Sequence, residues 1–229
     1  MAGGDINPLR RYGQGMADLI SRDATDFAAQ FTTPFGDHLA AAAAWTREHS
    51  SAPGMMSGLA EARLLEALIA SSGARRVLEI GTFTGVGTLT MAAALPADGR
   101  ITTLEKDPDS AANARRHFEA SAHAEKIDLI VGDALQSIAR LAGPFDLVYI
   151  DAWKTDYPAY YDAVVDKLSE RGVIVGDNLF RDGATLDSRI DDQGTEAMRA
   201  FARRVHADER VHNVLLTIGD GVLLAWRVY

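Results

Sequence analysis

The sequence predicts an α/β fold: a mostly parallel sheet that has helices on both faces and ends in an antiparallel hairpin. From residue 75 onward, short apolar runs with many β-branched residues alternate with longer segments rich in helix formers. These longer segments have the length of crossover helices, which consecutive parallel strands require. The last two apolar runs are separated only by Gly219, Asp220 and Gly221, a connection too short for anything but a hairpin. The final strand should therefore run antiparallel.

The predicted elements follow in order along the second part of the chain. The five parallel strands read RVLEIG, RITTLEKD, KIDLIVGD, FDLVYIDA and GVIVGDN, and they cover residues 76–81, 100–107, 126–133, 145–152 and 172–178. Helices are predicted between them at residues 86–96, 108–122, 134–143 and 157–172, and most of these end at Gly or Pro. The two hairpin strands cover residues 211–218 and 222–229.

The first part of the chain is predicted to be helical. Segments 16–31, 38–49 and 58–72 have the composition of helices, with breaks at Pro34, Pro53 and Gly73. A length of 229 residues, of which 47% are hydrophobic, suits one domain with a sizeable core. We therefore expect a single domain over residues 1–229, with a helical cap or partner surface at 1–74 and a cofactor- and metal-binding core at 75–229.

Composition narrows the possible partners. A formal net charge of −9 repels phosphate backbones and anionic lipid, so nucleic acid and membrane surfaces are poor candidates. The absence of cysteine excludes disulfides, thiolate metal sites and cysteine nucleophiles, so any metal must bind oxygen or imidazole. The N-terminal segment lacks the apolar core of a signal peptide, and no apolar run approaches the roughly 20 residues of a membrane span. We expect a soluble, cytoplasmic protein.

A glycine-rich turn follows the first predicted strand and indicates a ligand site. It reads EIGTFTGVGTLT, in which Gly81, Gly85 and Gly87 allow a sharp bend and close approach of a ligand to the backbone. A dinucleotide site would need G-x-G-x-x-G, whereas this spacing is G-x-x-x-G-x-G with Glu79 before it. The pattern therefore favours a nucleoside without phosphates, although such a turn can also serve tight packing alone.

Acidic residues at the strand ends indicate which nucleoside it is. Glu79, Glu105 and Asp133 lie at or near the ends of the first three strands, the edge where ligands bind in such sheets. Glu105 is placed to accept hydrogen bonds from a ribose diol, which fits either NAD or an adenosyl ligand. S-adenosylmethionine carries a sulfonium and an amino group, which favour a nearby acid such as Glu79. We therefore predict S-adenosylmethionine as the cofactor.

The next two strands end in oxygen ligands. Asp151 ends the fourth predicted strand, and Asp177 with Asn178 ends the fifth. Taken singly, such aspartates often serve as helix caps or turn residues. Two carboxylates and an amide oxygen delivered to one spot by adjacent strands instead suggest a hard divalent cation, Mg²⁺ or another such as Ca²⁺ or Mn²⁺.

Lys154 stands three residues beyond Asp151 and is the predicted general base. A divalent cation and the apolar ring of Trp153 would favour the neutral amine, which can accept a proton from an acceptor hydroxyl. We expect Trp153 to form a wall of the substrate pocket beside the cofactor rather than core. Core positions are expected for three tyrosines of the following helix: Tyr157, Tyr160 and Tyr161.

The remaining polar residues give weaker indications. His117 and His123 are six apart, which is not the spacing of metal ligands on one helix face, so we interpret them as surface residues. The run RRVHADER at 203–210 is interpreted as a solvated helix end. No nucleophile elbow or Ser-His-Asp pattern is present, so hydrolysis has little support.

Taken together, VLEIGTFTG, the acid of TLEKD, YIDAWK and VGDN resemble the cation-dependent O-methyltransferases, the family of catechol and caffeoyl-CoA O-methyltransferases. The resemblance extends from about Met55 to the C-terminal hairpin. It implies a Rossmann-like seven-stranded methyltransferase sheet, S-adenosylmethionine as donor, Mg²⁺ or a similar ion, and a homodimer.

The resemblance also assigns residues. Its metal ligands fall on Asp151, Asp177 and Asn178, and its catalytic lysine on Lys154. The cofactor contacts that it implies fall on Met55, Ser57, Glu79, Gly81, Thr82, Glu105 and Ala134, with Asp133 as a partner for the adenine amino group. At Gly87 the family commonly has a serine that contacts the methionine carboxylate, and Thr88 is the candidate substitute.

The same motifs bear on the acceptor. DAWK resembles the DHWK of catechol enzymes more than the DADK of plant caffeoyl-CoA enzymes, which favours a small, free, catechol-like acceptor. Segment 179–194 matches neither branch and would lie near the acceptor pocket in this fold. The leading hypothesis is metal-dependent methyl transfer to one hydroxyl of an aromatic vicinal diol. The alternatives are a nicotinamide-dependent dehydrogenase and a non-catalytic module that binds an adenosyl ligand.

Overall fold

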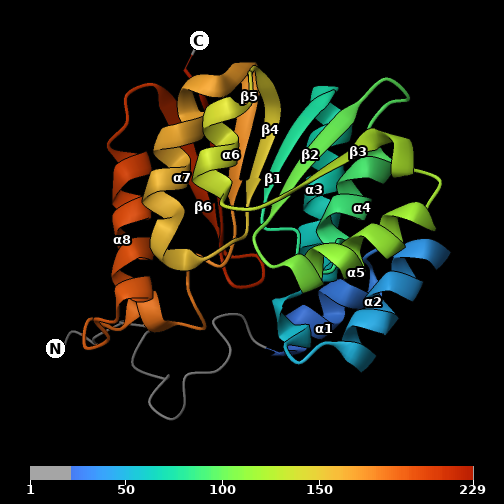
Figure 1. The fold of residues 1–229 in the computed structure, drawn as a ribbon. Helices are drawn as coiled ribbons and strands as arrows, with labels where there is room; N and C mark the ends of the chain where they lie inside the picture. Colours follow the sequence, from blue (N-terminus) through green and yellow to red (C-terminus); the bar gives the residue numbers. More distant parts are fainter. Residues whose placement is uncertain (1–21, 229) are drawn as a thin grey trace, which may run out of the picture.

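The computed structural model describes residues 22–228, and its seven strands form one sheet. The strand order is β3-β2-β1-β4-β5-β7-β6 (Figure 1). Strands β1 to β5 pair in parallel, whereas β7 runs antiparallel to both β5 and β6. The predicted mostly parallel sheet with an antiparallel C-terminal hairpin is therefore confirmed.

All seven predicted strands are present. Their bounds are Arg76–Ile80 (β1), Arg100–Glu105 (β2), Ile127–Val131 (β3), Phe145–Ile150 (β4), Leu168–Gly176 (β5), Val211–Leu216 (β6) and Val222–Arg227 (β7).

The prediction of a helix over residues 157–172 was wrong at its C-terminal end. Helix α7 covers Tyr157–Val164, a 3₁₀ turn follows, and β5 already begins at Leu168. Leu168 is buried and pairs with Phe145, and a register shift separates this pair from the next, Leu147 with Val173. Sheet pairing and burial of Leu168 thus override the local helix propensity of the segment.

Residues 22–228 contain seven further α-helices besides α7. Their bounds are Arg22–Gln30 (α1), Asp37–His49 (α2), Leu59–Ser72 (α3), Val86–Ala94 (α4), Pro108–Glu119 (α5), Ala134–Arg140 (α6) and Gln193–His206 (α8). For the predicted helix 16–31, residues 16–21 lie outside the described part of the chain.

Helix α8 was predicted only at its end, in the run 203–210. It starts after Asp192, whose side chain accepts from the backbone N–H groups of Gly194 and Thr195. The run is solvated only in part, because Val205 is fully buried in the core.

Helices cover both faces of the sheet, as predicted (Figure 1). Leu78 and Ile80 of β1 point toward the face packed by α6, α7 and α8, and Tyr157, Tyr160 and Tyr161 are buried there as expected. Val77 points toward the opposite face, which α3 and α4 cover. Helices α2 and α5 pack against α4. Among the described helices, none is long and apolar enough to cross a membrane.

The five parallel strands end at the same edge of the sheet. There, backbone hydrogen bonds continue just beyond the strands: Gly81 N donates to Leu104 O at 3.0 Å, and Asp151 N donates to Ile80 O at 2.9 Å. Asp177 N in turn donates to a carbonyl of β4 at 3.0 Å. The residues that follow β1, β4 and β5 are therefore held side by side, which brings the predicted site residues together.

Candidate active site

Lys154 lies at the centre of a polar cluster beyond β4 and β5. Its Nζ donates to Asp151 Oδ1 at 2.8 Å and to Asn178 Oδ1 at 2.6 Å. The third hydrogen bond goes to the hydroxyl of Tyr157 at 2.9 Å. All three ammonium protons are thus engaged, and two of the three predicted metal ligands converge on one cation.

Asp177 lies directly behind this cluster and is only 2% exposed. Its Oδ1 accepts from the backbone N–H of Asn178, and its Oδ2 accepts from the hydroxyl of Tyr149, both at 2.7 Å. Burial, and then the negative charge of Asp151, raise the pKa of the Asp177 carboxyl above its usual value. Asn178 has φ of 59°, a left-handed conformation that asparagine tolerates better than most residues.

The donor set formed by Asp151, Asp177 and Asn178 fits a hard divalent cation. It offers carboxylate and amide oxygens, and Asp151 with Asn178 already binds the positive charge of Lys154. The Asp151 charge still raises the pKa of buried Asp177 beside Lys154, and a divalent cation bound between the two carboxylates would relieve that repulsion. In residues 22–228, no group of three or more His, Asp or Glu side chains is arranged to hold a metal ion.

Glu79 forms a second polar centre, on the face of β1 opposite Leu78. It is 1% exposed, and its Oε2 accepts from the hydroxyl of Thr103 at 2.5 Å and from the hydroxyl of Thr88. The Thr103 hydroxyl is in turn 2.5 Å from that of Thr82. Burial raises the pKa of the Glu79 carboxyl from 4.5 to about 8. The hydroxyl of Thr88, the candidate substitute for a serine at position 87, is thus committed to Glu79.

Ser57 and Gly87 border the same centre. A methyl group built on Gly87 would lie 2.9 Å from Glu79 Oε1 and 3.7 Å from Ser57 Oγ. The Ser57 hydroxyl is 3.2 Å from the hydroxyl of Tyr149, which neighbours Glu79 across the β1–β4 pair. The absence of a side chain at position 87 thus leaves room for the Glu79 carboxyl.

The glycine-rich turn is held in a tightly bent conformation. Gly81 has φ of 101°, and a Cβ there would lie 2.0 Å from the carbonyl oxygen of Asp151, so only glycine fits. Glu105 fixes the turn from the neighbouring strand, since its Oε2 accepts from Phe83 N at 2.7 Å. Its Oε1 accepts from Asp107 N at 2.8 Å. Backbone hydrogen bonds therefore orient the side chain of Glu105, the predicted partner of the ribose.

Four other predicted cofactor contacts are placed less tightly. Met55 is 60% exposed in a short 3₁₀ turn before α3, and Trp153 is 74% exposed. Trp153 is thus outside the core, as predicted. Asp133 caps α6 by accepting from Gln136 N at 2.9 Å, and Ala134 is the first residue of that helix.

Sequence reasoning missed three contributions. Tyr149 bridges Ser57 and Asp177, yet it was assigned only to a strand. Tyr157 was assigned only to the core, although its hydroxyl hydrogen reaches the carbonyl oxygens at the ends of β4 and β5 and its oxygen accepts from Lys154. Thr103 holds Glu79. A tyrosine within a buried strand is itself a signal, because its hydroxyl needs a partner.

The expectation that the two histidines are surface residues was also inexact. His117 and His123 are half-buried. His117 Nδ1 lies 2.8 Å from the carbonyl oxygen of Thr84 in the glycine-rich turn, and its ring packs edge-on against Trp45. This histidine therefore links α5 and α2 to the turn.

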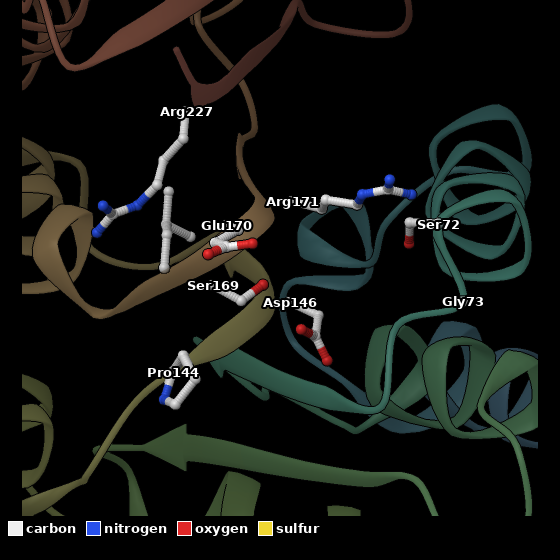
Figure 2. A pocket seen from close by; sticks show the side chains of 9 residues that line it. Ser72, Gly73, Pro144, Asp146, Ser169, Glu170, Arg171 and Arg227 are labelled. Carbon is white, nitrogen blue, oxygen red and sulfur yellow. The ribbon is translucent and has the colours of Figure 1, made fainter. Parts of the chain in front are cut away.

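A hollow of about 550 Å³ lies at the opposite edge of the sheet (Figure 2). It is lined by residues at the start of β4 and β5, including Asp146, Ser169 and Arg171. Asp146 accepts from the backbone N–H groups of Arg75 and Arg76, both at 2.9 Å. Its carboxyl is thus committed to structure, and the predicted site residues lie away from this hollow.

Comparison with known proteins identifies the family. A family model described as O-methyltransferase matches residues 37–228. Catechol O-methyltransferase of Mycobacterium tuberculosis is 37% identical over 173 residues, which cover 74% of this chain and 78% of that protein. Catechol O-methyltransferase of Niastella koreensis is 34% identical over 175 residues, which cover 72% of this chain and 79% of the relative.

Solved structures agree with this match. The O-methyltransferase TomG from Streptomyces achromogenes, in complex with SAM, superposes with a TM-score of 0.82 at 28% identity, covering 90% of this chain and 96% of TomG. The O-methyltransferase from Bacillus cereus, in complex with SAH, gives a TM-score of 0.82 at 27% identity, covering 90% and 97%. These findings confirm the resemblance seen in the motifs and give no support to a nicotinamide dehydrogenase. The chain belongs to the O-methyltransferase family.

Proposed function

We propose that this enzyme transfers the methyl group of S-adenosylmethionine to one hydroxyl of a catechol-type vicinal diol, with the help of a divalent cation. The observation that carries the proposal is the convergence of Asp151 and Asn178 on Lys154 Nζ, with the buried carboxyl of Asp177 behind them. Catechol O-methyltransferases of two bacteria are among the relatives, and the DAWK sequence points to the same acceptor class.

In this proposal, Asp151, Asp177 and Asn178 hold the cation. When bound there, a divalent cation would favour loss of the proton from an acceptor hydroxyl nearby. Lys154 takes that proton as the general base. Since all three of its N–H groups are engaged, it must first give up one proton and one of its hydrogen bonds.

The cofactor would lie along the ends of β1, β2 and β3. Glu79 is the partner for its amino group, Glu105 for its ribose, and Asp133 for its adenine. Further contacts are proposed for Met55, Ser57, Gly81, Thr82, Gly87, Thr88, Ala134 and Trp153. The acceptor oxygen then bonds to the methyl carbon while the carbon–sulfur bond breaks and the sulfur keeps the electron pair. Holding the two reactants in line can supply several powers of ten in rate.

The test is transfer of labelled methyl from S-adenosylmethionine to a panel of catechols, such as caffeic and protocatechuic acids. Assays run with Mg²⁺, with EDTA, and with EDTA followed by excess Mg²⁺. We expect methylation that EDTA stops and Mg²⁺ restores. Methylation that EDTA leaves unchanged would refute the metal-binding roles, and cofactor binding without turnover on any catechol would favour the binding-module alternative.

We further propose a homodimer, as the family resemblance implies. Light scattering coupled to size-exclusion chromatography measures this directly. A mass near twice the 24.6 kDa of the chain is expected, and a monomer at all protein concentrations would contradict it.

A further inference from the structure

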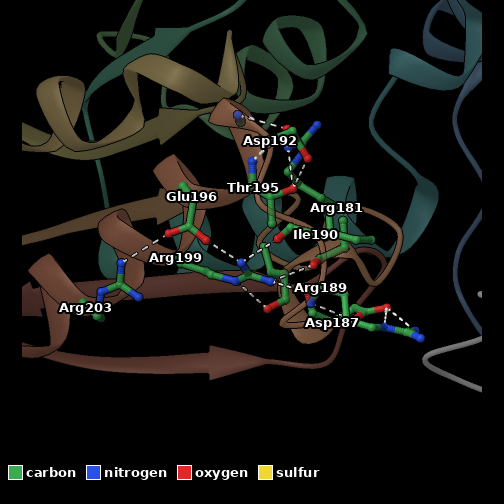
Figure 3. Close-up of polar contacts among 12 residues, drawn as sticks. Arg181, Asp187, Arg189, Ile190, Asp192, Thr195, Glu196, Arg199 and Arg203 are labelled. Carbon is green, nitrogen blue, oxygen red and sulfur yellow. Dashed lines mark hydrogen bonds and ion pairs between the residues drawn. The ribbon is translucent and has the colours of Figure 1, made fainter.

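Arg199 of α8 is bonded at every N–H of its guanidinium group (Figure 3). One N–H pairs with Glu196 in the same helix, and the other four donate to backbone carbonyl groups of a single loop. The four carbonyls belong to Ala184 at 3.1 Å, Thr185 at 3.0 Å, Asp187 at 2.6 Å and Ile190 at 2.8 Å. A guanidinium has five N–H donors, so Arg199 has none left for a ligand.

The loop that Arg199 holds starts at the proposed metal site. It begins directly after Asn178, and its first turn contains Arg181 and Asp182, both with positive φ, near 50°. Such backbone conformations cost energy in residues other than glycine and need fixing from outside. Arg181 supplies one such tie, because its Nη1 donates to Asp192 at 2.7 Å and to Thr195 at 2.9 Å at the start of α8.

Helix α8 supports both sides of the same region. It packs against the 3₁₀ turn Lys154–Asp156, which carries the proposed base, and against the 3₁₀ turn Ala184–Leu186 of the loop. A large apolar side chain is exposed at each of these places, Trp153 beside the first turn at 74% and Leu186 in the second at 62%. Trp153 directly precedes Lys154, so an aromatic acceptor held near Lys154 would meet its exposed ring, and Leu186 gives the loop an exposed apolar side chain of its own.

We propose that Arg199 is a positioning residue. It fixes residues 184–190, the part of this loop that its guanidinium binds, as a preformed wall on the acceptor side of the active site. The inference rests on the proposed function, since it concerns the same site and an aromatic acceptor. Residues 184–190 belong to no strand. Within the loop, Ala184 O accepts from Asp187 N and Asp187 O accepts from Ile190 N, and the guanidinium adds four further bonds to the same backbone. Without it, acceptor binding has to order the loop, which weakens acceptor affinity and leaves the cofactor side unchanged.

The experiment compares Arg199→Ala and Arg199→Lys with the control Arg203→Ala. Arg203 lies one turn further along α8, carries the same charge, and is 68% exposed with only a 4.0 Å pairing to Glu196. For both Arg199 variants we expect the acceptor KM to rise by about tenfold or more, with the Kd for S-adenosylmethionine within about twofold of wild type. Lysine keeps the charge but has three donors from one point, so it should not rescue the loss.

Hydrogen exchange provides the second readout. Amides of residues 184–190 should exchange about tenfold faster or more in both Arg199 variants and at the wild-type rate in Arg203→Ala. A Kd for S-adenosylmethionine that worsens in parallel with KM would show a general loss of structure and overturn the proposal. So would an acceptor KM no different from that of Arg203→Ala. If the wild-type enzyme methylates no catechol, the proposed function fails first, and unchanged exchange in the Arg199 variants would independently refute the positioning role.

Discussion

Glu79 gives the sharpest prediction, because burial in the cofactor-free protein favours its neutral carboxyl, whereas the cofactor favours the carboxylate. Its pKa is raised by burial to about 8, so roughly nine in ten molecules hold it neutral at pH 7 and roughly one in ten at pH 9. The sulfonium and amino groups of S-adenosylmethionine favour the carboxylate. If the cofactor binds only the ionised form, its Kd should fall by about tenfold between pH 7 and pH 9.

Isothermal titration calorimetry measures this coupling directly. At pH 7, binding should release nearly one proton from the protein, and the observed heat should therefore vary with the ionisation enthalpy of the buffer. Glu79→Gln keeps the shape and the hydrogen bonds from Thr103 and Thr88 but has no titrating proton. Glu79→Gln should therefore lose this proton release, and any proton release that remains in the variant comes from ionisation of the cofactor itself.

Two results would refute this reasoning. One is a binding heat that is the same in all buffers at pH 7, which means that no proton leaves Glu79. The other is an equal pH dependence of Kd in wild type and Glu79→Gln, which would assign the effect to the ligand or to another group.

Four further predictions concern the same site. In the cofactor-free protein, the raised pKa of Glu79, about 8, contributes stability that is present below about pH 4.5 and lost as pH rises through 8. Because Glu79→Gln has no such loss, its free energy of unfolding in urea should rise relative to that of wild type between pH 4.5 and pH 9. Asp151→Ala should abolish labelled-methyl transfer while the cofactor Kd changes less than about twofold, and parallel loss of binding would contradict its role. Tyr149→Phe removes a donor to buried Asp177 and should cost about 1–3 kcal/mol in urea unfolding, a value near zero being the contrary result. Gly87→Ala places a methyl 2.9 Å from Glu79 Oε1, so calorimetry should find cofactor affinity lower by roughly tenfold, and unchanged affinity would show that Glu79 can move freely.

The strands and the edge of the sheet were predictable because each carries its own local signal. Buried parallel strands are short, apolar and β-branched, and their carboxyl ends must meet at one edge. Asp151, Asp177 and Asn178 could therefore be placed near one another from their positions in the chain alone. The contact of Asp151 and Asn178 through Lys154 follows from the backbone bonds that align the ends of β4 and β5.

The features that escaped prediction depend on contacts between distant segments. The early start of β5 depends on pairing of Leu168 with Phe145. Helix α8 begins in a polar, glycine-containing stretch, and only its cap at Asp192 and its buried face identify its start. The role of Arg199 cannot be read from sequence, because its partners are main-chain carbonyls that any residues could supply.

Tyr149 gives a physical reason for the proposed cofactor site and the proposed metal site to act together. Tyr149 pairs with Glu79 in the register of β1 and β4, and its hydroxyl joins Ser57 on one side to Asp177 on the other. Burial raises the pKa of Tyr149 well above its usual value, so the hydroxyl stays protonated and remains a donor to Asp177. Any shift of the segment before α3 on cofactor binding therefore reaches a proposed metal ligand through two hydrogen bonds. This predicts weaker coupling between cofactor and metal affinity in Tyr149→Phe, and equal coupling in variant and wild type would exclude this route.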